Sequence, residues 1–285
     1  MISYLKMLIT ALVCGVFALL PVPYGAHYAF LADAMYLTKD RNQLTLYFAL
    51  ISVASTAVVL VALHKIYGRA LTAPFAKAAT PQEKQSKENY LRLLRNLGIL
   101  LIPAVLVMIP LPNNINLLDL LPALLQKDYL LVTASCCIGS GLFLLISRWY
   151  AKRRRNPTSH TTSLRALLRF LFYQLPSYFL PGVSGISVGA SNLLLCDVED
   201  TIVVREVLLY YAPPVFLMNV VRVVRCILQG VVLDPVMIAI AVVVSAGASI
   251  FVLRLLSRMN LRKTFLFFAI YAVIFGLVIG VYAFI

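Results

Sequence analysis

Six uninterrupted apolar runs set the architecture of this chain, because a helix of roughly 20 residues crosses a ~30 Å hydrocarbon core. Of the 285 residues, 61% are hydrophobic and 13% are charged, a composition far more apolar than that of soluble domains. The runs lie at residues 44–65, 92–112, 129–147, 206–228, 236–253 and 264–284. The sequence therefore predicts an all-α, multi-pass membrane protein forming a single transmembrane domain over residues 1–285.

The basic residues gather between the apolar runs. A net charge of +14 would suggest a nucleic-acid partner for a soluble protein, but here the charge follows the loops, so we exclude nucleic acid. The basic clusters fall within residues 65–95, 148–169 and 254–263. By the positive-inside rule all three are cytoplasmic, whereas residues 113–128 and 229–235, with few basic residues, lie outside.

Two proline-centred breaks interrupt apolar stretches about half a chain apart. The first break covers residues 20–27 (Leu-Pro-Val-Pro-Tyr-Gly-Ala-His) and the second covers residues 180–187 (Leu-Pro-Gly-Val-Ser-Gly-Ile-Ser). A membrane helix tolerates such residues at bilayer depth only where protein or a water-filled cavity satisfies the freed backbone groups. Paired breaks in two halves point to a membrane binding site.

The predicted topology makes each broken stretch a re-entrant helical hairpin. Residues 7–37 enter from and return to the outer face, and residues 170–197 do so from the cytoplasmic face. Each half is then one hairpin plus three spans, repeat 1 at 1–148 and repeat 2 at 165–285, with cytoplasmic linkers at 66–91 and 149–164. Three is odd, so the halves form an inverted repeat, and we expect the two breaks to meet near the bilayer midplane.

The breaks suit an anion such as a phosphate or diphosphate, because helix N-termini present unpaired N–H groups. His27 could donate to a phosphate oxygen or act as acid or base, or could simply bond a neighbouring carbonyl. Arg222 and Arg225 lie three residues apart inside a span, where they either bind phosphate or extend to the outer interface. The five cysteines show no CxxC or Cys/His spacing, and we predict no metal site from them.

The pattern Gly15, Pro21-Val22 and His27, followed by Pro181-Gly182-Val183-Ser184, resembles the two signature regions of the bacterial undecaprenyl-diphosphate phosphatase (UppP/BacA) family. The resemblance covers essentially the whole chain. It implies a protein of the bacterial inner (plasma) membrane that hydrolyses a C55 lipid diphosphate to the monophosphate carrier of cell-wall synthesis, usually with a divalent metal ion.

The departures from that family pattern concern the chemistry. Cys14 and Ala18 stand where the resemblance implies two glutamates, and Gly185 stands where it implies an arginine. The remaining catalytic candidates are His27 and Ser184. The predicted substrate contacts are Tyr24, Gly25, Gly182, Gly185, Ser187, Arg222 and Arg225.

Three functions are compatible with these residues. The first is a catalytically degenerate relative that binds or translocates a polyprenyl phosphate, since the second break also resembles a motif of the polyprenyl-phosphate translocase family (domain of unknown function 368). The second is a working diphosphatase that recruits other acids; the candidates are Asp33, Asp197, Glu199, Asp200 and Glu206. The third is a structural or regulatory membrane protein. Carboxylates beside the breaks would favour hydrolysis, and cations without them would favour binding alone.

Overall fold

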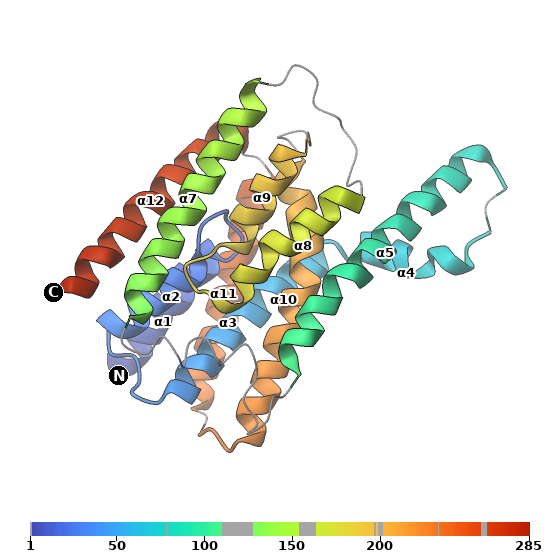
Figure 1. Cartoon of the computed structure of the whole chain (residues 1–285). Coiled ribbons are helices and arrows are strands. Elements are labelled where there is room, and N and C mark those ends of the chain that lie inside the picture. The colour runs from blue at the N-terminus through green and yellow to red at the C-terminus, as the bar shows by residue number, and fades with distance from the viewer. Residues whose placement is uncertain are drawn as a thin grey trace.

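The computed structural model describes residues 2–77, 79–109, 128–153, 164–196, 198, 202–232, 234–257 and 261–285. Within these ranges the chain forms eleven α-helices, one short 3-10 helix and no sheet (Figure 1). The all-α prediction is confirmed. The helices are α1 (Ile2–Phe17), α2 (Tyr24–Ala34), α3 (Arg41–Ala62), α4 (His64–Thr72), α5 (Pro81–Met108), α7 (Tyr129–Arg153), α8 (Leu164–Phe179), α9 (Gly185–Leu195), α10 (Val203–Leu228), α11 (Pro235–Leu256) and α12 (Leu261–Phe284), with the 3-10 helix η1 (Ala73–Phe75) after α4.

Six of the described helices are long and apolar enough to cross a membrane, namely α3, α5, α7, α10, α11 and α12. They coincide with the six apolar runs, which confirms a multi-pass membrane protein. Helices α3 and α11 begin before their runs because polar side chains cap them: Asp40 accepts from the Asn42 amide before α3, and Asp234 accepts from the Val236 amide before α11.

Two shorter helical hairpins contain the breaks. In the first, α1 ends at Phe17 and α2 begins at Tyr24, directly after Pro23. In the second, α8 ends at Phe179 and α9 begins at Gly185. The prolines of these turns, Pro21, Pro23 and Pro181, have no N–H with which to continue the preceding helix. In Figure 1 the first hairpin opens toward the end of the bundle that holds both termini and the loop after α10, and the second opens toward the opposite end.

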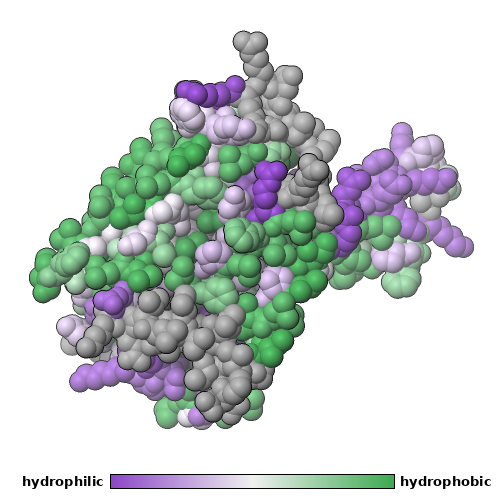
Figure 2. All heavy atoms as spheres, viewed as in Figure 1, coloured by the Kyte–Doolittle hydropathy of each residue, from purple (hydrophilic) through white to green (hydrophobic). Residues whose placement is uncertain are grey.

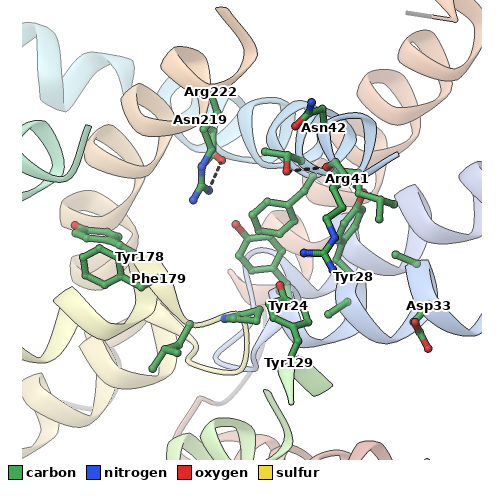
Figure 3. Close-up of a pocket in the computed structure, with 18 of the residues that line it drawn as sticks. Tyr24, Tyr28, Asp33, Arg41, Asn42, Tyr129, Tyr178, Phe179, Asn219 and Arg222 are labelled. Atoms are coloured by element: carbon green, nitrogen blue, oxygen red, sulfur yellow. Dashed lines mark hydrogen bonds between the residues drawn. The ribbon is translucent and has the colours of Figure 1, made fainter. Parts of the chain in front are cut away.

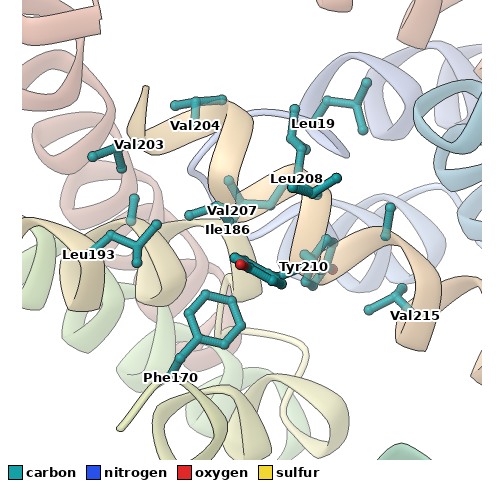
Figure 4. Packing of buried hydrophobic residues seen from close by; sticks show 14 of the residues in the cluster. Leu19, Phe170, Ile186, Leu193, Val203, Val204, Val207, Leu208, Tyr210 and Val215 are labelled. Carbon is teal, nitrogen blue, oxygen red and sulfur yellow. The ribbon is translucent and has the colours of Figure 1, made fainter. Parts of the chain in front are cut away.

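Helix packing places the hairpins within the bundle. The long helices pair as α3 with α10 and α7 with α12, while α1 packs on α11 and α9 packs on α7 and α10. One of the buried clusters includes the place where α9 meets α8 and α10, with Phe170, Ile186 and Val207 among its members (Figure 4). The second break is therefore held by densely packed apolar side chains.

The segment 66–91, which we expected to be a linker without apolar periodicity, is largely helical. It contains most of α4, all of η1 and the start of α5, which together project from the bundle (Figure 1). The early start of α5 has a local cause: Thr80 accepts from the Glu83 amide, the Glu83 carboxylate accepts from the Thr80 amide, and Pro81 occupies the first turn. Of the second linker, 149–164, helix α7 covers the residues up to Arg153, and residues 154–163 lie outside the described ranges.

Candidate functional site

A pocket of about 900 Å³ lies between the two hairpins, the start of α3 and the C-terminal half of α10. Residues of both breaks line it: Tyr24 and Gly25 from the first, and Leu180, Pro181 and Val183 from the second. Its volume falls in the range of small-molecule sites. Figure 3 shows its labelled side chains coming from α2, α3, α7, α10 and the second hairpin.

The two breaks are in contact at the pocket wall. A Cβ placed on Gly25 would lie 2.8 Å from the carbonyl oxygen of Pro181, a separation that real Cβ atoms essentially never show. Glycine is therefore required for this approach. Gly25 of the first break thus lies directly against Pro181 of the second.

Tyrosines form much of the pocket wall. The Tyr24 hydroxyl lies 2.7 Å from the Ser52 hydroxyl, and the Tyr28 hydroxyl donates to the Leu44 carbonyl at 2.6 Å. The Tyr24 ring also stacks on Phe48 with centroids 5.4 Å apart. These contacts join α2 to α3 and orient the two rings along the pocket wall. Tyr129 and Tyr178 complete the set.

Basic side chains surround the opening of the pocket. Lys39 and Arg41 precede or begin α3, and Arg222 and Arg225 belong to the last turns of α10. Arg222 donates from Nη1 to the Asn219 side-chain oxygen at 3.4 Å and extends into the space that faces Tyr24 (Figure 3). Four cations at one opening make this an electropositive site.

Asp33 is the acidic residue among the described residues that line the pocket. Its carboxylate accepts a hydrogen bond from the Tyr282 hydroxyl at 3.1 Å and is exposed. Across the described ranges, no group of three His, Cys, Asp or Glu side chains could hold a metal ion. One carboxylate among four cations does not fit a divalent metal ion, which prefers several anionic oxygen ligands. Of the other candidate acids, Glu206 does not line the pocket, and Asp197, Glu199 and Asp200 lie outside the described residues.

His27 lies beside the pocket rather than in its lining. It is 3% exposed, and its ring is stacked between Phe17 and Phe275, each with a centroid 4.0 Å away. Nδ1 bonds the Pro23 carbonyl at 3.0 Å, so Nδ1 carries the proton and Nε2 accepts from the Tyr271 hydroxyl at 2.7 Å. This geometry corresponds to the alternative in which the histidine bonds a neighbouring carbonyl.

The predicted residues of the second break also have partners in the protein. The Ser184 hydroxyl caps α9 by accepting from the Ser187 amide at 3.1 Å, and the Ser187 hydroxyl donates to the Ser140 carbonyl at 3.4 Å. A Cβ on Gly182 would collide with the Thr133 carbonyl, and one on Gly185 would collide with Gln174 and Tyr211. These two glycines make room for helix packing.

The structure thus brings together four of the predicted residues, Tyr24, Gly25, Arg222 and Arg225, in the pocket lining. The others, His27, Gly182, Ser184, Gly185 and Ser187, lie behind that lining. Lys39, Arg41, Asn219 and Tyr129 line the pocket and were missed. The signal for Lys39 and Arg41 was their place in a segment predicted to be outside, where the positive-inside rule expects few basic residues.

The fold and the pocket define a multi-pass helical membrane protein with an electropositive site between two helical hairpins, each of which turns at a proline-containing break. A family model described as Bacitracin resistance protein BacA matches residues 7–278, and the chain belongs to this family of undecaprenyl-diphosphate phosphatases. No curated protein matches the chain.

Proposed function

We propose that this protein binds a polyprenyl phosphate or diphosphate, such as the undecaprenyl carrier of a bacterial plasma membrane, with the headgroup in the pocket between the breaks. The observation that carries the proposal is the cluster of Lys39, Arg41, Arg222 and Arg225 around a pocket built by both breaks. Membership of the BacA family supports the same class of ligand.

The charge of the pocket fits a phosphate headgroup. Arginine presents a planar set of donors that matches phosphate oxygens, and such charge-assisted bonds are about twice as strong as neutral ones. A single exposed carboxylate, Asp33, leaves the described lining strongly positive.

The apolar part of the lining fits the lipid tail. Ala29, Phe48, Val215 and Met218 share the pocket with the charged groups. A ligand with an anionic head and an isoprenoid chain contacts both kinds of surface, whereas inorganic phosphate contacts one. Headgroup and tail together therefore account for the mixed character of the pocket.

The proposed architecture is an inverted repeat of one re-entrant hairpin and three spans. In this scheme α3 corresponds to α10, α5 to α11 and α7 to α12. The packing supports it, since α3 pairs with α10 and α7 with α12, as expected of helices beside a twofold axis. Other contacts also have counterparts under this scheme. The contact of α3 with α11 corresponds to that of α10 with α5, and the contact of α1 with α11 corresponds to that of α8 with α5. Both breaks then lie near the bilayer midplane, the usual position of transporter sites.

The proposed role is that of a catalytically degenerate binder or translocase. Cys14 is fully buried and Ala18 is 5% exposed, and neither lines the pocket, so the positions where the family pattern has glutamates supply no carboxylate. Gln174 and Tyr211 fill the space beside Gly185, where that pattern has an arginine. Removing one preorganised charge-stabilising group commonly lowers a rate by ~10² to 10³.

Hydrolysis of the lipid diphosphate is the second candidate, favoured by membership of the BacA family. In that case Asp33, the acidic residue among the described lining residues, is the candidate to assist the reaction, which proceeds without the two glutamates implied by the family pattern.

Lipid binding tests the proposal directly. Native mass spectrometry of the purified protein should show C55 monophosphate bound in preference to the phosphate-free C55 polyprenol, and the same sample should release little phosphate from C55 diphosphate. Equal binding of the two lipids contradicts the headgroup site and leaves a structural or regulatory role. Efficient phosphate release selects the second candidate.

A further inference from the structure

The part of the chain that projects from the bundle is a defined structural unit, which we call the arm: α4, η1 and residues 81–95 of α5. Two side-chain hydrogen bonds join the α4–η1 part of the arm to α5. Lys87 donates from Nζ to the Ala76 carbonyl at 2.7 Å, and Arg69 donates to the Tyr90 hydroxyl at 3.4 Å. Together with the capping of α5 by Thr80, these bonds fix the orientation of the arm's surfaces.

One surface of the arm is apolar and uncovered. Leu71 is 63% exposed and Phe75, four residues later, is 88% exposed. The other apolar face of α4 is occupied, because Ile66, Tyr67 and Ala70 pack into the main core. The exposed pair therefore faces away from the protein. Figure 2 shows apolar atoms along one edge of the projecting arm, next to its hydrophilic face.

The remaining surface of the arm is basic. Residues 64–95 contain seven Lys or Arg side chains and two acidic ones, Glu83 and Glu88. Lys65, Lys77 and Lys84 are exposed, and they do not take part in the two bonds that hold the arm together. A helix that combines exposed large apolar groups with lysines is typical of segments lying in the headgroup layer of a bilayer.

The start of α4 gives the arm its direction. Helix α3 ends at Ala62 and α4 begins at His64, so Leu63 alone separates a candidate membrane span from the arm. The His64 ring bonds the Val61 carbonyl at 2.7 Å and satisfies backbone freed by the bend. The arm therefore leaves the bundle at the end of one candidate span, α3, and returns to it through another, α5 (Figure 1).

We propose that the arm docks on the surface of the bilayer itself, with Leu71 and Phe75 inserted among the acyl chains and its lysines bound to anionic phospholipid headgroups. We choose an anionic bilayer as the partner because its headgroups complement the basic face of the arm, whereas a neutral surface would leave those lysines without a counterion. The inference is independent of the lipid-carrier pocket, because none of these residues lines it.

A single tryptophan reports the position of the apolar face. Trp149, the one tryptophan in the sequence, is first replaced by phenylalanine, and Phe75→Trp is then compared with Ser86→Trp, an exposed polar position on the first turns of α5. In vesicles with phosphatidylglycerol, the tryptophan at position 75 should emit at shorter wavelength and be quenched by brominated lipid. The tryptophan at position 86 should instead be quenched by aqueous iodide. Equal iodide quenching at both positions overturns the proposal.

A variant without the exposed lysines tests the contribution of the basic face separately from that of the apolar face. Combined Lys65→Gln, Lys77→Gln and Lys84→Gln should reduce the blue shift of the tryptophan at position 75 in phosphatidylglycerol vesicles and leave it unchanged in phosphatidylcholine vesicles. If the tryptophan at position 75 inserts equally deeply in both kinds of vesicle, with and without the three lysines, the proposed binding of anionic headgroups is wrong. Exposure in vesicles combined with protection in native membranes overturns lipid docking and indicates a protein partner.

Discussion

Gly25 lies directly against the backbone of Pro181, so closely that a Cβ on the glycine would be 2.8 Å from the proline carbonyl oxygen. The two residues are 156 positions apart in the sequence and belong to different hairpins. Both residues line the pocket, and their contact joins the two hairpins at the breaks.

Gly25→Ala should lower the stability of the protein by about 1–3 kcal/mol, the usual effect of overpacking a close contact. The carbonyl of Pro181 is backbone and cannot move aside as a side chain could. Thermal unfolding in detergent measures the change. The matched control is Gly247→Ala in the interior of α11, where nothing lies within 4 Å of the added methyl group, and helix propensity predicts no loss there. Equal stability of the two variants would show that the breaks can separate without penalty.

Arg222→Gln and Arg225→Gln should each weaken binding of C55 monophosphate by roughly tenfold or more, because a hydrogen bond to a charged group is worth about 1.5–3 kcal/mol. The control is Arg254→Gln, an exposed position near the end of α11 that does not line the pocket. Wild-type affinity should also fall as salt is raised. Affinities that are unchanged in both pocket variants argue against a headgroup at this opening.

Tyr271→Phe should destabilise the protein by about 1–3 kcal/mol, because it leaves the buried Nε2 of His27 without its donor. Tyr282→Phe serves as the comparison, since its bond to Asp33 is exposed and its loss should change stability by less than about 0.5 kcal/mol. His27→Ala should cost more than Tyr271→Phe, because it also removes the stacking on Phe17 and Phe275. If His27→Ala instead leaves stability intact and abolishes a phosphatase activity, the histidine is catalytic.

Phosphate release from C55 diphosphate should be absent or severely reduced, with or without divalent metal ions. The pocket offers one carboxylate among its described residues, and Cys14 and Ala18 supply none. Single-turnover assays with radiolabelled lipid provide the measurement. Metal-dependent turnover that is lost in Asp33→Asn would demonstrate that this acid has been recruited for hydrolysis.

The proposed topology predicts opposite labelling of two engineered cysteines. In a variant without the five native cysteines, Ser86→Cys in the arm should react with a membrane-impermeant maleimide only from the cytoplasmic side. Lys39→Cys at the pocket opening should react only from the outside. Both positions are exposed, so accessibility is set by the membrane alone. Labelling from the same side contradicts the arrangement.

Much of the fold was predictable because membrane insertion depends on local hydropathy. A run of about 20 apolar residues has few alternatives in lipid, and the two breaks combine proline with glycine or a second proline, which favours a turn; Pro213 and Pro214, by contrast, lie within the continuous helix α10. The arm was the exception: α5 begins before its apolar run because Thr80 and Glu83 cap it, and α4 has one apolar face, Ile66, Tyr67 and Ala70, packed on the main core. The motifs around Pro21 and Pro181 were sufficient to place the chain in its family.

The site was predictable in part. Arg222 and Arg225 stood out because charged groups inside a span need a polar environment. His27 also stood out for its place in a break, yet its partners Phe17, Tyr271 and Phe275 come from helices at both ends of the chain. No local pattern reveals such a set.

The sequence by itself determined the membrane class, the six spans, the two breaks and the family, because each follows from the chemistry of contiguous residues. Only the tertiary structure decided which side chains share the pocket. It placed Arg41 and Arg222 at one opening because α3 packs against α10, and it placed His27, Ser184 and Gly185 behind the wall because the faces of α2 and α9 that bear them are turned into the protein. Rotation of a helix about its own axis is set by the shapes of its neighbours, and those neighbours are distant in the sequence.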